Sequence, residues 1–332
     1  MANIQDVARH ANVGVGTVSR VLSGKGYVKE ETRKKVEASI AALDYIPNEM
    51  ARNLYFRKSG IVAVIVPEVA HPFFAEFVNA AEVALGKRGY QMMVCNTFYE
   101  SNYELKYLEM LRQQRVDGII FGAHTSLDIS QYEKINRPIV AMDRNLGDKI
   151  PCVMANHREG GKLAAQELIR SGCKNVLQFG TLKGEDKVST PSSIRHTVFD
   201  TMMREHGIIC HSTSIKWHIS DYKYYLKIAE QMLDKYPDID GVFAADIIAM
   251  AVLQVALVRG KKVPEEFRVV GYDGTNGVGL MYPKITTIVQ PIEDLADETV
   301  RLVVDIINGK SVKVKREELP VTLRVGDTTI RA

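Results

Sequence analysis

Short apolar runs that alternate with helical stretches constrain the fold of this chain most strongly. The first series comprises IVAVIV (61–66), YQMMVC (90–95), VDGIIF (116–121) and PIVAM (138–142). Continuous apolar runs of this length are typical of strands buried on both faces, as in parallel sheets. Helical stretches at 73–88 and 101–115 separate them, so this segment predicts a parallel α/β unit.

A second series of the same kind follows along the chain. Its strands are expected at NVLQFG (175–180), DGVFAA (240–245) and FRVVGY (267–272), with helices near 158–171, 221–235 and 246–259. A helix over 292–308 and a strand near 317–323 complete the pattern. The predicted fold class is α/β, with a bilobed body that contains two doubly wound parallel sheets.

The first 47 residues have a helical pattern instead. Ile4, Val7, Ala8 and Ala11 recur at the spacing of one helix face. A second helix is expected to begin near Gly14 and to bury Val18, Val21 and Leu22, and a third to run from Glu30 to Leu43 with Val36, Ile40 and Leu43 inward. Three short helices, the first two joined by a tight turn, predict a helix-turn-helix head.

The run G-V-G-T-V-S at residues 14–19 has an alternative interpretation as a dinucleotide-binding glycine loop. Such a loop must follow a strand, because its glycines let the strand turn tightly into the helix that receives pyrophosphate. A helix precedes Gly14 here. The context therefore excludes a dinucleotide loop.

The basic charge of the chain is concentrated at its N-terminus. Residues 1–58 contain ten basic and six acidic side chains, whereas the other 274 residues contain 33 basic and 34 acidic ones. A net charge of +4 on a small head beside a nearly neutral body indicates a polyanion partner for the head.

Composition and motifs exclude several other classes of protein. The four cysteines are scattered and the eight histidines form no ligand pattern, so no metal and no cofactor is expected. The N-terminus lacks the apolar stretch of a signal peptide, and no run reaches the ~18 apolar residues of a membrane span. We expect a cytoplasmic protein without a membrane partner.

Two N-terminal segments carry a resemblance to a known family. NIQDVARHANVGVGTVSRVL and TRKKVEASIAALDYIPNEMARNL resemble the LacI/GalR (lactose repressor) family of bacterial transcription regulators. C-N-T (95–97) and F-G-A-H-T (121–125) are similar to the sucrose-operon repressors within it. The resemblance implies a head at 1–47, a hinge helix at 48–58 and a periplasmic-binding-protein-like body at 59–332. It also implies a first lobe of about 59–157 and 291–322 and a second of about 158–290 and 323–332.

In that family the second helix lies in the major groove of DNA. The resemblance implies that Val15, Gly16 and Arg20 face base edges and that Thr17 and Ser19 lie nearer the phosphates. Arg20 can donate a bidentate pair to guanine, and its alternative role is a nonspecific phosphate contact. Gly16 has no side chain to read a base, and its alternative role is to let the backbone approach DNA closely.

The hinge segment has only two predicted turns, and isolated helices this short are marginal in water. Asn48 is a good N-cap for it. By resemblance, Leu54 is the residue that each of two protomers inserts into the minor groove at the centre of the operator. Tyr55 and Phe56 follow it and are expected to pack on the adjacent body.

Several polar residues follow the predicted strands of the body, where open α/β sheets bind ligands. They are Asp143, Arg144, Asp246 and Asp273. In the resembled family a helix arginine reaches into the ligand-binding crevice of the body, and Arg195 is the matching residue. Carboxylates and guanidinium groups pair well with adjacent hydroxyls, so a sugar is the expected effector. An aspartate after a strand is also an ordinary helix N-cap. Phe73 and Phe74 either stack on the sugar or fill the core, and Trp217 is a further candidate for the crevice.

Three positions depart from the family pattern: Val198, Ala245 and Gly326. Val198 and Ala245 fall near the expected ligand, so the identity of the effector does not transfer from any one relative.

The sequence therefore predicts a homodimeric, sequence-specific DNA-binding regulator of a pseudo-palindromic operator. We expect a repressor of a sugar-utilisation operon that a small sugar or phosphosugar releases. The alternative is a corepressor-dependent regulator that its ligand tightens on DNA. An enzyme is not expected, because the chain contains no P-loop, G-x-S-x-G or metal motif. A transport-linked sugar receptor is excluded by the missing signal peptide and by the DNA-reading head.

Overall fold

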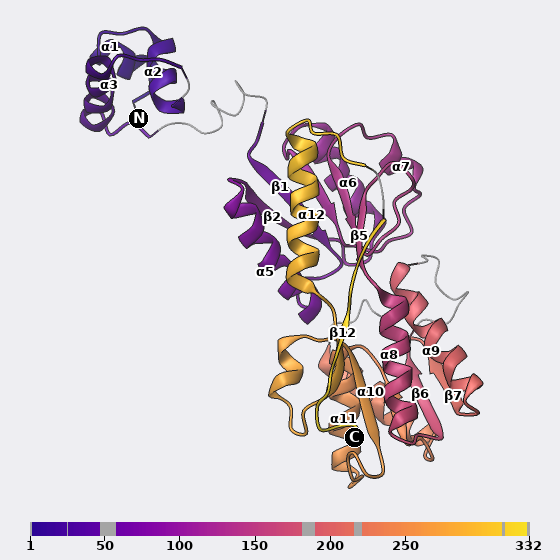
Figure 1. Ribbon diagram of the computed structural model, residues 1–332. Coiled ribbons are helices and arrows are strands. Elements are labelled where there is room, and N and C mark those ends of the chain that lie inside the picture. Colours follow the sequence, from indigo (N-terminus) through magenta and orange to yellow (C-terminus); the bar gives the residue numbers. More distant parts are fainter. Residues whose placement is uncertain are drawn as a thin grey trace. The chain divides into compact units, whose positions relative to one another are not determined.

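The computed structural model describes residues 2–24, 26–46, 58–180, 190–215, 221–313 and 316–330. These form two compact units, one within residues 1–59 and one within residues 60–332. Figure 1 draws the N-terminal unit in indigo and the larger unit from violet to yellow.

The N-terminal unit consists of three helices, as the sequence predicts. They are α1 (Ile4–His10), α2 (Val15–Ser23) and α3 (Glu30–Ala42). Asn3 caps α1, because its side chain accepts from two backbone amides of the first turn while Asp6 accepts from the Asn3 amide. Val7, Val18 and Val36 are fully buried where the three helices meet.

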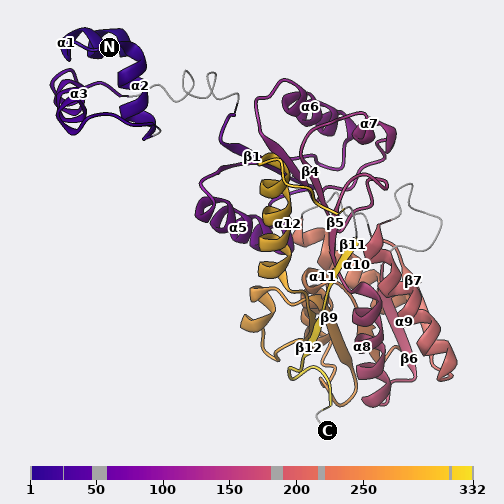
Figure 2. The same cartoon turned by 45° about the horizontal axis from the view of Figure 1, so that its top comes forward.

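The first lobe of the larger unit is built on a six-stranded sheet in which every described pair is parallel. In spatial order its strands are β11 (Arg316–Leu319), β5 (Cys152–Ala155), β4 (Ile139–Met142), β3 (Gly118–Phe121), β1 (Ile61–Val66) and β2 (Gln91–Asn96). The helices of this lobe are α5 (Pro72–Lys87), α6 (Ser101–Arg112), α7 (Ser130–Glu133) and α12 (Ile292–Ile307). Figures 1 and 2 show α5 and α12 side by side on one face of the sheet.

The second lobe is built on another six-stranded sheet. Its strands in spatial order are β12 (Thr322–Arg324), β10 (Thr286–Val289), β9 (Arg268–Asp273), β8 (Gly241–Phe243), β6 (Asn175–Phe179) and β7 (Ile209–Thr213). Its helical segments are α8 (His157–Arg170), η1 (Pro191–Ser193), α9 (Ile194–Glu205), α10 (Tyr222–Lys235), α11 (Asp246–Val258) and η2 (Asn276–Leu280). β12 pairs antiparallel with β10, so this sheet is mixed where an all-parallel sheet was expected.

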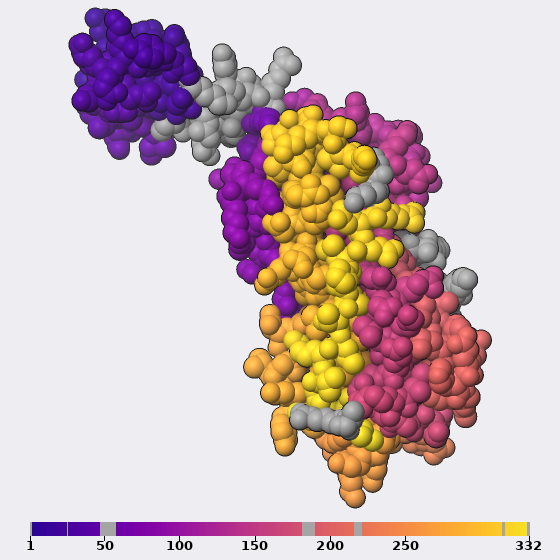
Figure 3. Space-filling model, viewed as in Figure 1, coloured from indigo at the N-terminus to yellow at the C-terminus, as the bar shows by residue number. Residues whose placement is uncertain are grey.

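The chain crosses between the two sheets three times in the described structure: between β5 and α8, between β10 and α12, and between β11 and β12. The yellow C-terminal segment in Figure 3 passes over the body from one lobe to the other. Pro320 separates β11 from β12, so the single strand expected near 317–323 is two strands in different sheets. Thr322 already pairs with the second sheet, one residue before the expected change of lobe.

Three strands have no counterpart in the sequence prediction: β5, β7 and β10. β7 is an edge strand whose residues are at most half-buried, and polar residues interrupt its apolar pattern. β10 begins with Thr286 and Thr287, which are both fully buried. Their hydroxyls are hydrogen-bonded inside the second lobe, and an apolar-run criterion has no means of detecting such residues.

Two glycines of α8 allow unusually close packing in the second lobe. A Cβ on Gly160 would lie 2.7 Å from the Tyr272 hydroxyl, and a Cβ on Gly161 would lie 2.3 Å from the carbonyl oxygen of Arg195. The obstacle at Gly161 is backbone and cannot rotate away. Helices α8 and α9 therefore approach each other at a distance that only glycine permits.

We expect the substitution Gly161→Ala to destabilise the body by about 1–3 kcal/mol, because it overpacks a rigid contact. Gly86→Ala in α5 is the matched control, because a Cβ there meets nothing within 4 Å. The control should be neutral or up to about 1 kcal/mol more stable, since alanine favours helices over glycine. Chemical denaturation measures both changes. Equal stability of the two variants would contradict the packing described here.

Candidate functional site

The second helix of the head presents one face to solvent and buries the other. Gly14 is its N-cap, and Val15, Gly16 and Arg20 are exposed while Val18 and Val21 are buried. A helix that keeps its N-terminal residues exposed in this way has the geometry of a recognition helix in the major groove. Thr17 and Ser19 are half-buried beside this face. Asn48 and Leu54 lie outside the described residues.

The side chain of Arg20 lies along the exposed face of α2. Its Nε donates to the carbonyl oxygen of Gly16 at 3.1 Å, and its Cδ lies where a Cβ on Gly26 would be 3.3 Å away. Among the residues that the structure describes, no carboxylate pairs with it. The terminal N–H groups of the guanidinium therefore remain available to donate to a guanine or a phosphate.

Asp143 follows β4 and adopts a left-handed backbone conformation with a φ of 49°. It is buried, and its Oδ1 accepts from the Ala155 amide at 3.2 Å and lies 2.8 Å from Nε2 of His157. The carboxylate is therefore fixed where β4, β5 and the start of α8 meet.

Arg195 enters the same region from α9 of the second lobe. Its guanidinium carbon lies 4.2 Å from the centre of the Tyr272 ring, and its Nε donates to Nε2 of His196 at 3.2 Å. Because Nε2 accepts, the proton of His196 is on Nδ1, which lies 3.1 Å from Oε1 of Gln178. Burial and the Arg195 charge lower the pKa of His196 well below its ordinary value.

Asp273 ends β9 and is buried in the same region. It accepts from Nε2 of Gln290 at 2.8 Å and has a φ of 120°, in the region that favours glycine. Burial and the nearby carboxylate of Asp246 raise its pKa to about 8. The carboxyl group is thus largely protonated at neutral pH and can donate as well as accept a hydrogen bond.

Asp246 is engaged within the second lobe. It is the first residue of α11, after the N-cap Ala245. Its Oδ2 accepts from the amide and the hydroxyl of Thr275, and its Oδ1 accepts from Thr287 at 2.6 Å. Burial raises its pKa to about 6. These contacts hold the loop after β9. The sequence analysis offered a helix N-cap as the alternative role of Asp246 and did not predict these contacts.

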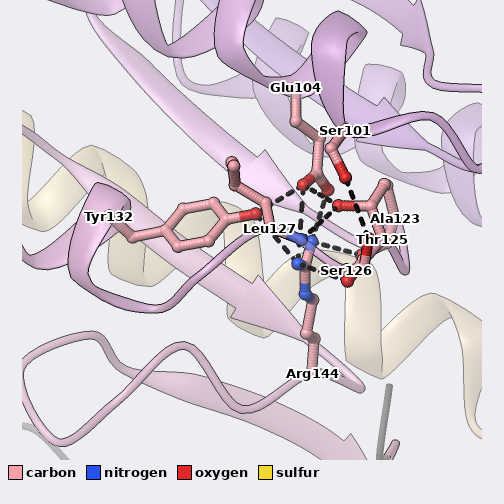
Figure 4. Close-up of polar contacts among 8 residues, drawn as sticks. All are labelled: Ser101, Glu104, Ala123, Thr125, Ser126, Leu127, Tyr132 and Arg144. Atoms are coloured by element: carbon pink, nitrogen blue, oxygen red, sulfur yellow. Dashed lines mark hydrogen bonds and ion pairs between the residues drawn. The ribbon is translucent and has the colours of Figure 1, made fainter. Parts of the chain in front are cut away.

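Arg144 is engaged within the first lobe, in the network of Figure 4. Its guanidinium forms an ion pair with Glu104 and donates to the Ala123 carbonyl at 2.7 Å and to the Tyr132 hydroxyl at 2.8 Å. The hydroxyls of Tyr132 and Thr125 donate to Glu104 in turn. Arg144 and Glu104 are both buried, so the contacts of this arginine stabilise the loops after β3 and β4.

Phe73 and Phe74 both belong to the main apolar cluster of the body. They are 5% and 9% exposed, and their rings meet edge to face with centroids 5.2 Å apart. Of the two expected roles, these contacts favour core packing, most clearly for Phe73. Phe74 also lies beside the ring of His71.

Three residues that the sequence analysis did not select lie among these groups: His124, His157 and Tyr272. Burial lowers the pKa of His124 to about 4, and that of His71 falls to about 4 for the same reason. Tyr272 directly precedes Asp273 in V-V-G-Y-D-G, which is the only sequence signal that pointed toward it. His157 looked like an ordinary first residue of a helix.

A cavity of about 640 Å³ lies beside Arg144 and His157. Residues from both lobes line it, including Thr125, Asn145 and Arg158 together with Ile194. In the described part of the chain no group of three or more His, Cys, Asp or Glu residues could hold a metal ion. No helix within the described ranges is long and apolar enough to cross a membrane.

A three-helix head with an exposed second helix and a two-lobed α/β body with buried polar groups define a class: ligand-responsive regulators that bind DNA. A family model described as "Bacterial regulatory proteins, lacI family" matches residues 3–48. A second model, "Periplasmic binding proteins and sugar binding domain of LacI family", matches residues 59–323. The chain belongs to the LacI family of bacterial transcription regulators.

Individual relatives match along the whole chain. A ribose operon repressor of Halalkalibacterium halodurans is 36% identical over 330 residues, which cover 99% of this chain and 97% of the relative. A sucrose operon repressor of Streptococcus mutans is 35% identical over 329 residues and covers 99% of each chain. The structure of the lac repressor dimer bound to operator and the anti-inducer ONPF matches with a TM-score of 0.84 and 25% identity over 99% of both chains.

These matches confirm the predicted family, the helix-turn-helix head and the periplasmic-binding-protein-like body. The protein is a DNA-binding transcription regulator with a sugar-binding type of domain, and its family is not enzymatic. The prediction that it is not an enzyme is therefore confirmed by family membership.

The raised pKa of Asp273 predicts a pH dependence of stability. Because its pKa rises from near 4 to about 8 on folding, the native state binds the extra proton between these values. Stability should therefore fall as the pH rises from 7 to 8. The lowered pKa values of His71, His124 and His196 act in the opposite sense, and this effect fades above about pH 7 because unfolded histidine titrates near 6.5. Burial raises the pKa of each of the four cysteine thiols, which adds to the fall toward pH 8. Melting temperatures across this window measure the effect.

Asp273→Asn should reduce the fall in melting temperature, most clearly near pH 7.5, since asparagine does not titrate. The exposed Asp238 provides the control, Asp238→Asn, which should behave as the wild type does. An undiminished slope in Asp273→Asn would assign the titration to another group.

Proposed function

We propose that this regulator represses a sugar-utilisation operon as a homodimer. Each head reads one half-site of a pseudo-palindromic operator, and a small sugar or phosphosugar in the body weakens that binding. The observation that supports DNA reading most directly is the exposed face of α2, on which Arg20 has no carboxylate partner among the described residues. Relatives named as ribose and sucrose operon repressors support the class of operon.

On the DNA side, we assign base reading to Arg20 and to Val15, whose methyl groups suit a thymine methyl. Gly16 leaves its position without direct readout, and a Cβ there would meet only the end of the Arg20 side chain at 3.9 Å. Thr17 and Ser19 bind phosphates. We propose Asn48 as the cap of a hinge helix and Leu54 as the minor-groove wedge on the basis of the family resemblance alone.

On the effector side, we propose that Asp143, Arg195 and Asp273 contact the ligand. They come from both lobes and mix a carboxylate, a guanidinium and a carboxyl group with a pKa near 8, which together match donors and acceptors of sugar hydroxyls. We propose no direct ligand contact for Arg144 and Asp246, because their polar atoms already have partners in their own lobes.

Exposed apolar side chains of the second lobe support the homodimer. Leu280, Tyr282 and Val258 are 90%, 88% and 82% exposed, and the first two lie in or just after η2, which packs on α11. Leu280 and Tyr282 are two residues apart, and neighbouring exposed apolar side chains of this size are typical of an interface with another protein. A second copy of the chain accounts for them, because a palindromic operator requires two heads.

Arg20→Ala should weaken operator binding by about 1–3 kcal/mol, which is the value of a bidentate guanine contact. Fluorescence anisotropy with DNA from upstream of the protein's own gene measures the change. Arg20→Lys discriminates between the two roles of this residue, because lysine keeps the charge for a phosphate but cannot form the bidentate pair. Lys34→Ala, an exposed basic residue of α3, is the control. Full binding by Arg20→Ala would overturn the assignment.

The same assay with D-ribose, sucrose and their phosphate esters tests the effector side. Release of DNA by one of these compounds is the expected result, and the Asp143→Asn variant should need at least about tenfold more ligand, since it loses a charged hydrogen-bond acceptor. Tighter DNA binding would identify a corepressor instead. If none of the compounds changes DNA binding or the melting temperature, the proposed effector class is wrong.

A further inference from the structure

His157 occupies the point where the chain passes from the first sheet into the second lobe. It is the first residue of α8, two residues after β5 ends, and it is 2% exposed. Both nitrogens of its imidazole have partners. Nε2 lies 2.8 Å from Oδ1 of Asp143, which follows β4 of the first lobe, and Nδ1 lies 2.7 Å from the hydroxyl of Tyr272, which is in β9 of the second lobe.

The chemistry of the three groups determines which atom donates and which accepts in each hydrogen bond. A carboxylate can only accept, so Nε2 of His157 donates to Asp143. In the neutral imidazole Nδ1 then accepts, and the Tyr272 hydroxyl donates to it. Burial raises the pKa of Tyr272, so the hydroxyl keeps its proton. Tyr272, His157 and Asp143 thus form one directed chain of hydrogen bonds from the second lobe to the first.

The two ends of this chain of hydrogen bonds lie in different lobes. At the first-lobe end, the two hydrogen bonds to Asp143 both involve Oδ1, and within the described residues Oδ2 has no partner. At the second-lobe end, the ring of Tyr272 supports the guanidinium of Arg195 at 4.2 Å. Tyr272 reaches this position only because residue 160 is glycine, since a Cβ would lie 2.7 Å from the hydroxyl.

We propose that His157 is a positioning residue that couples Asp143 of the first lobe to Tyr272 and Arg195 of the second, so that residues of both lobes contact the same effector together. The proposal rests on the effector site described under Proposed function. His157 acts through Asp143 and Tyr272, because both nitrogens of its ring are engaged by these two residues. It fixes Oδ1 of Asp143, which leaves Oδ2 for a sugar hydroxyl, and it holds the two lobes at the separation at which Asp143 and Arg195 reach the same ligand.

Two conservative substitutions break the chain at different points. In His157→Gln both polar atoms lie at the end of one side chain, so glutamine can satisfy only one of the two partners at a time. Tyr272→Phe keeps the ring beneath Arg195 and removes only the hydroxyl. His206→Gln is the control, because His206 is an exposed histidine of the same lobe.

The first readout needs no ligand. Spin labels on the exposed positions of Lys106→Cys in α6 and Lys227→Cys in α10 report the separation of the lobes in the full chain, in a Cys210→Ser background. Without the hydrogen-bonded chain, the distribution of label distances should become broader in His157→Gln and in Tyr272→Phe and should stay unchanged in His206→Gln. Unchanged distributions in both test variants would overturn the proposal.

The second readout is sugar affinity by calorimetry, with D-ribose and sucrose as the probes. Each single variant should bind the effective sugar about tenfold more weakly, and the double variant no more weakly than the weaker single, because both changes break the same chain. Multiplied losses in the double variant would overturn the coupling. A role in stability alone would lower the melting temperature and leave both readouts at their wild-type values.

The two failures are distinguishable. If the wild type binds neither sugar, the proposed effector class fails, and the distance distributions alone then decide the role of His157. If the wild type binds a sugar and the variants bind it equally well, the effector class stands and the positioning role of His157 is wrong.

Discussion

One continuous apolar cluster supports both lobes of the body. It includes side chains of β1 and α5 in the first lobe, of β9 and α8 in the second, and of α12 after the second crossing. Because burial of apolar surface is the main favourable term in folding, this cluster stabilises both sheets at once. The polar groups at the strand ends are held by a rigid scaffold, which is the condition for a binding site that recognises a small molecule with few contacts.

The body tolerates buried charge only where it is compensated. Removing a guanidinium and a carboxylate from water costs several kcal/mol per group unless they are paired and further hydrogen-bonded. Arg144 and Glu104 meet that condition, since each has partners beyond the ion pair itself. Asp273 meets it differently: its pKa of about 8 lets it remain neutral in the interior. Arg144 and Glu104 thus form a structural ion pair, whereas Asp273 is a buried carboxyl group that can still gain or lose a proton.

The head and the body depend on different kinds of interaction. The head is a small basic unit whose second helix has one exposed face, and the affinity of such units for DNA depends on charge and on a few direct contacts. The body carries almost no net charge, and His157 links polar groups of its two lobes, Asp143 and Tyr272. Effector control requires that a ligand bind two arrangements of the lobes with different affinity. Groups that bridge the lobes can produce this difference, because their contacts change when the lobes rearrange.

The sequence by itself determined the local elements and the family. Helical and strand periodicities located α1 to α3 and most of the strands, because these depend on neighbours within a few positions. The same reasoning missed β10, whose buried threonines are satisfied by distant partners. It also predicted that Asp143 and Asp273 lie at a common edge, because strand ends of a parallel sheet share one edge, whereas the expectation for Arg195 came from the family resemblance.

Only the tertiary structure decided what each polar residue does. Arg144 and Asp246 looked equivalent to Asp143 in sequence, yet Glu104, Thr275 and Thr287 engage them inside single lobes. His157 gave no signal, because its partners are 14 and 115 positions away along the chain. Partnership between distant side chains depends on how the sheets are stacked and crossed, and no local pattern of residues contains that information.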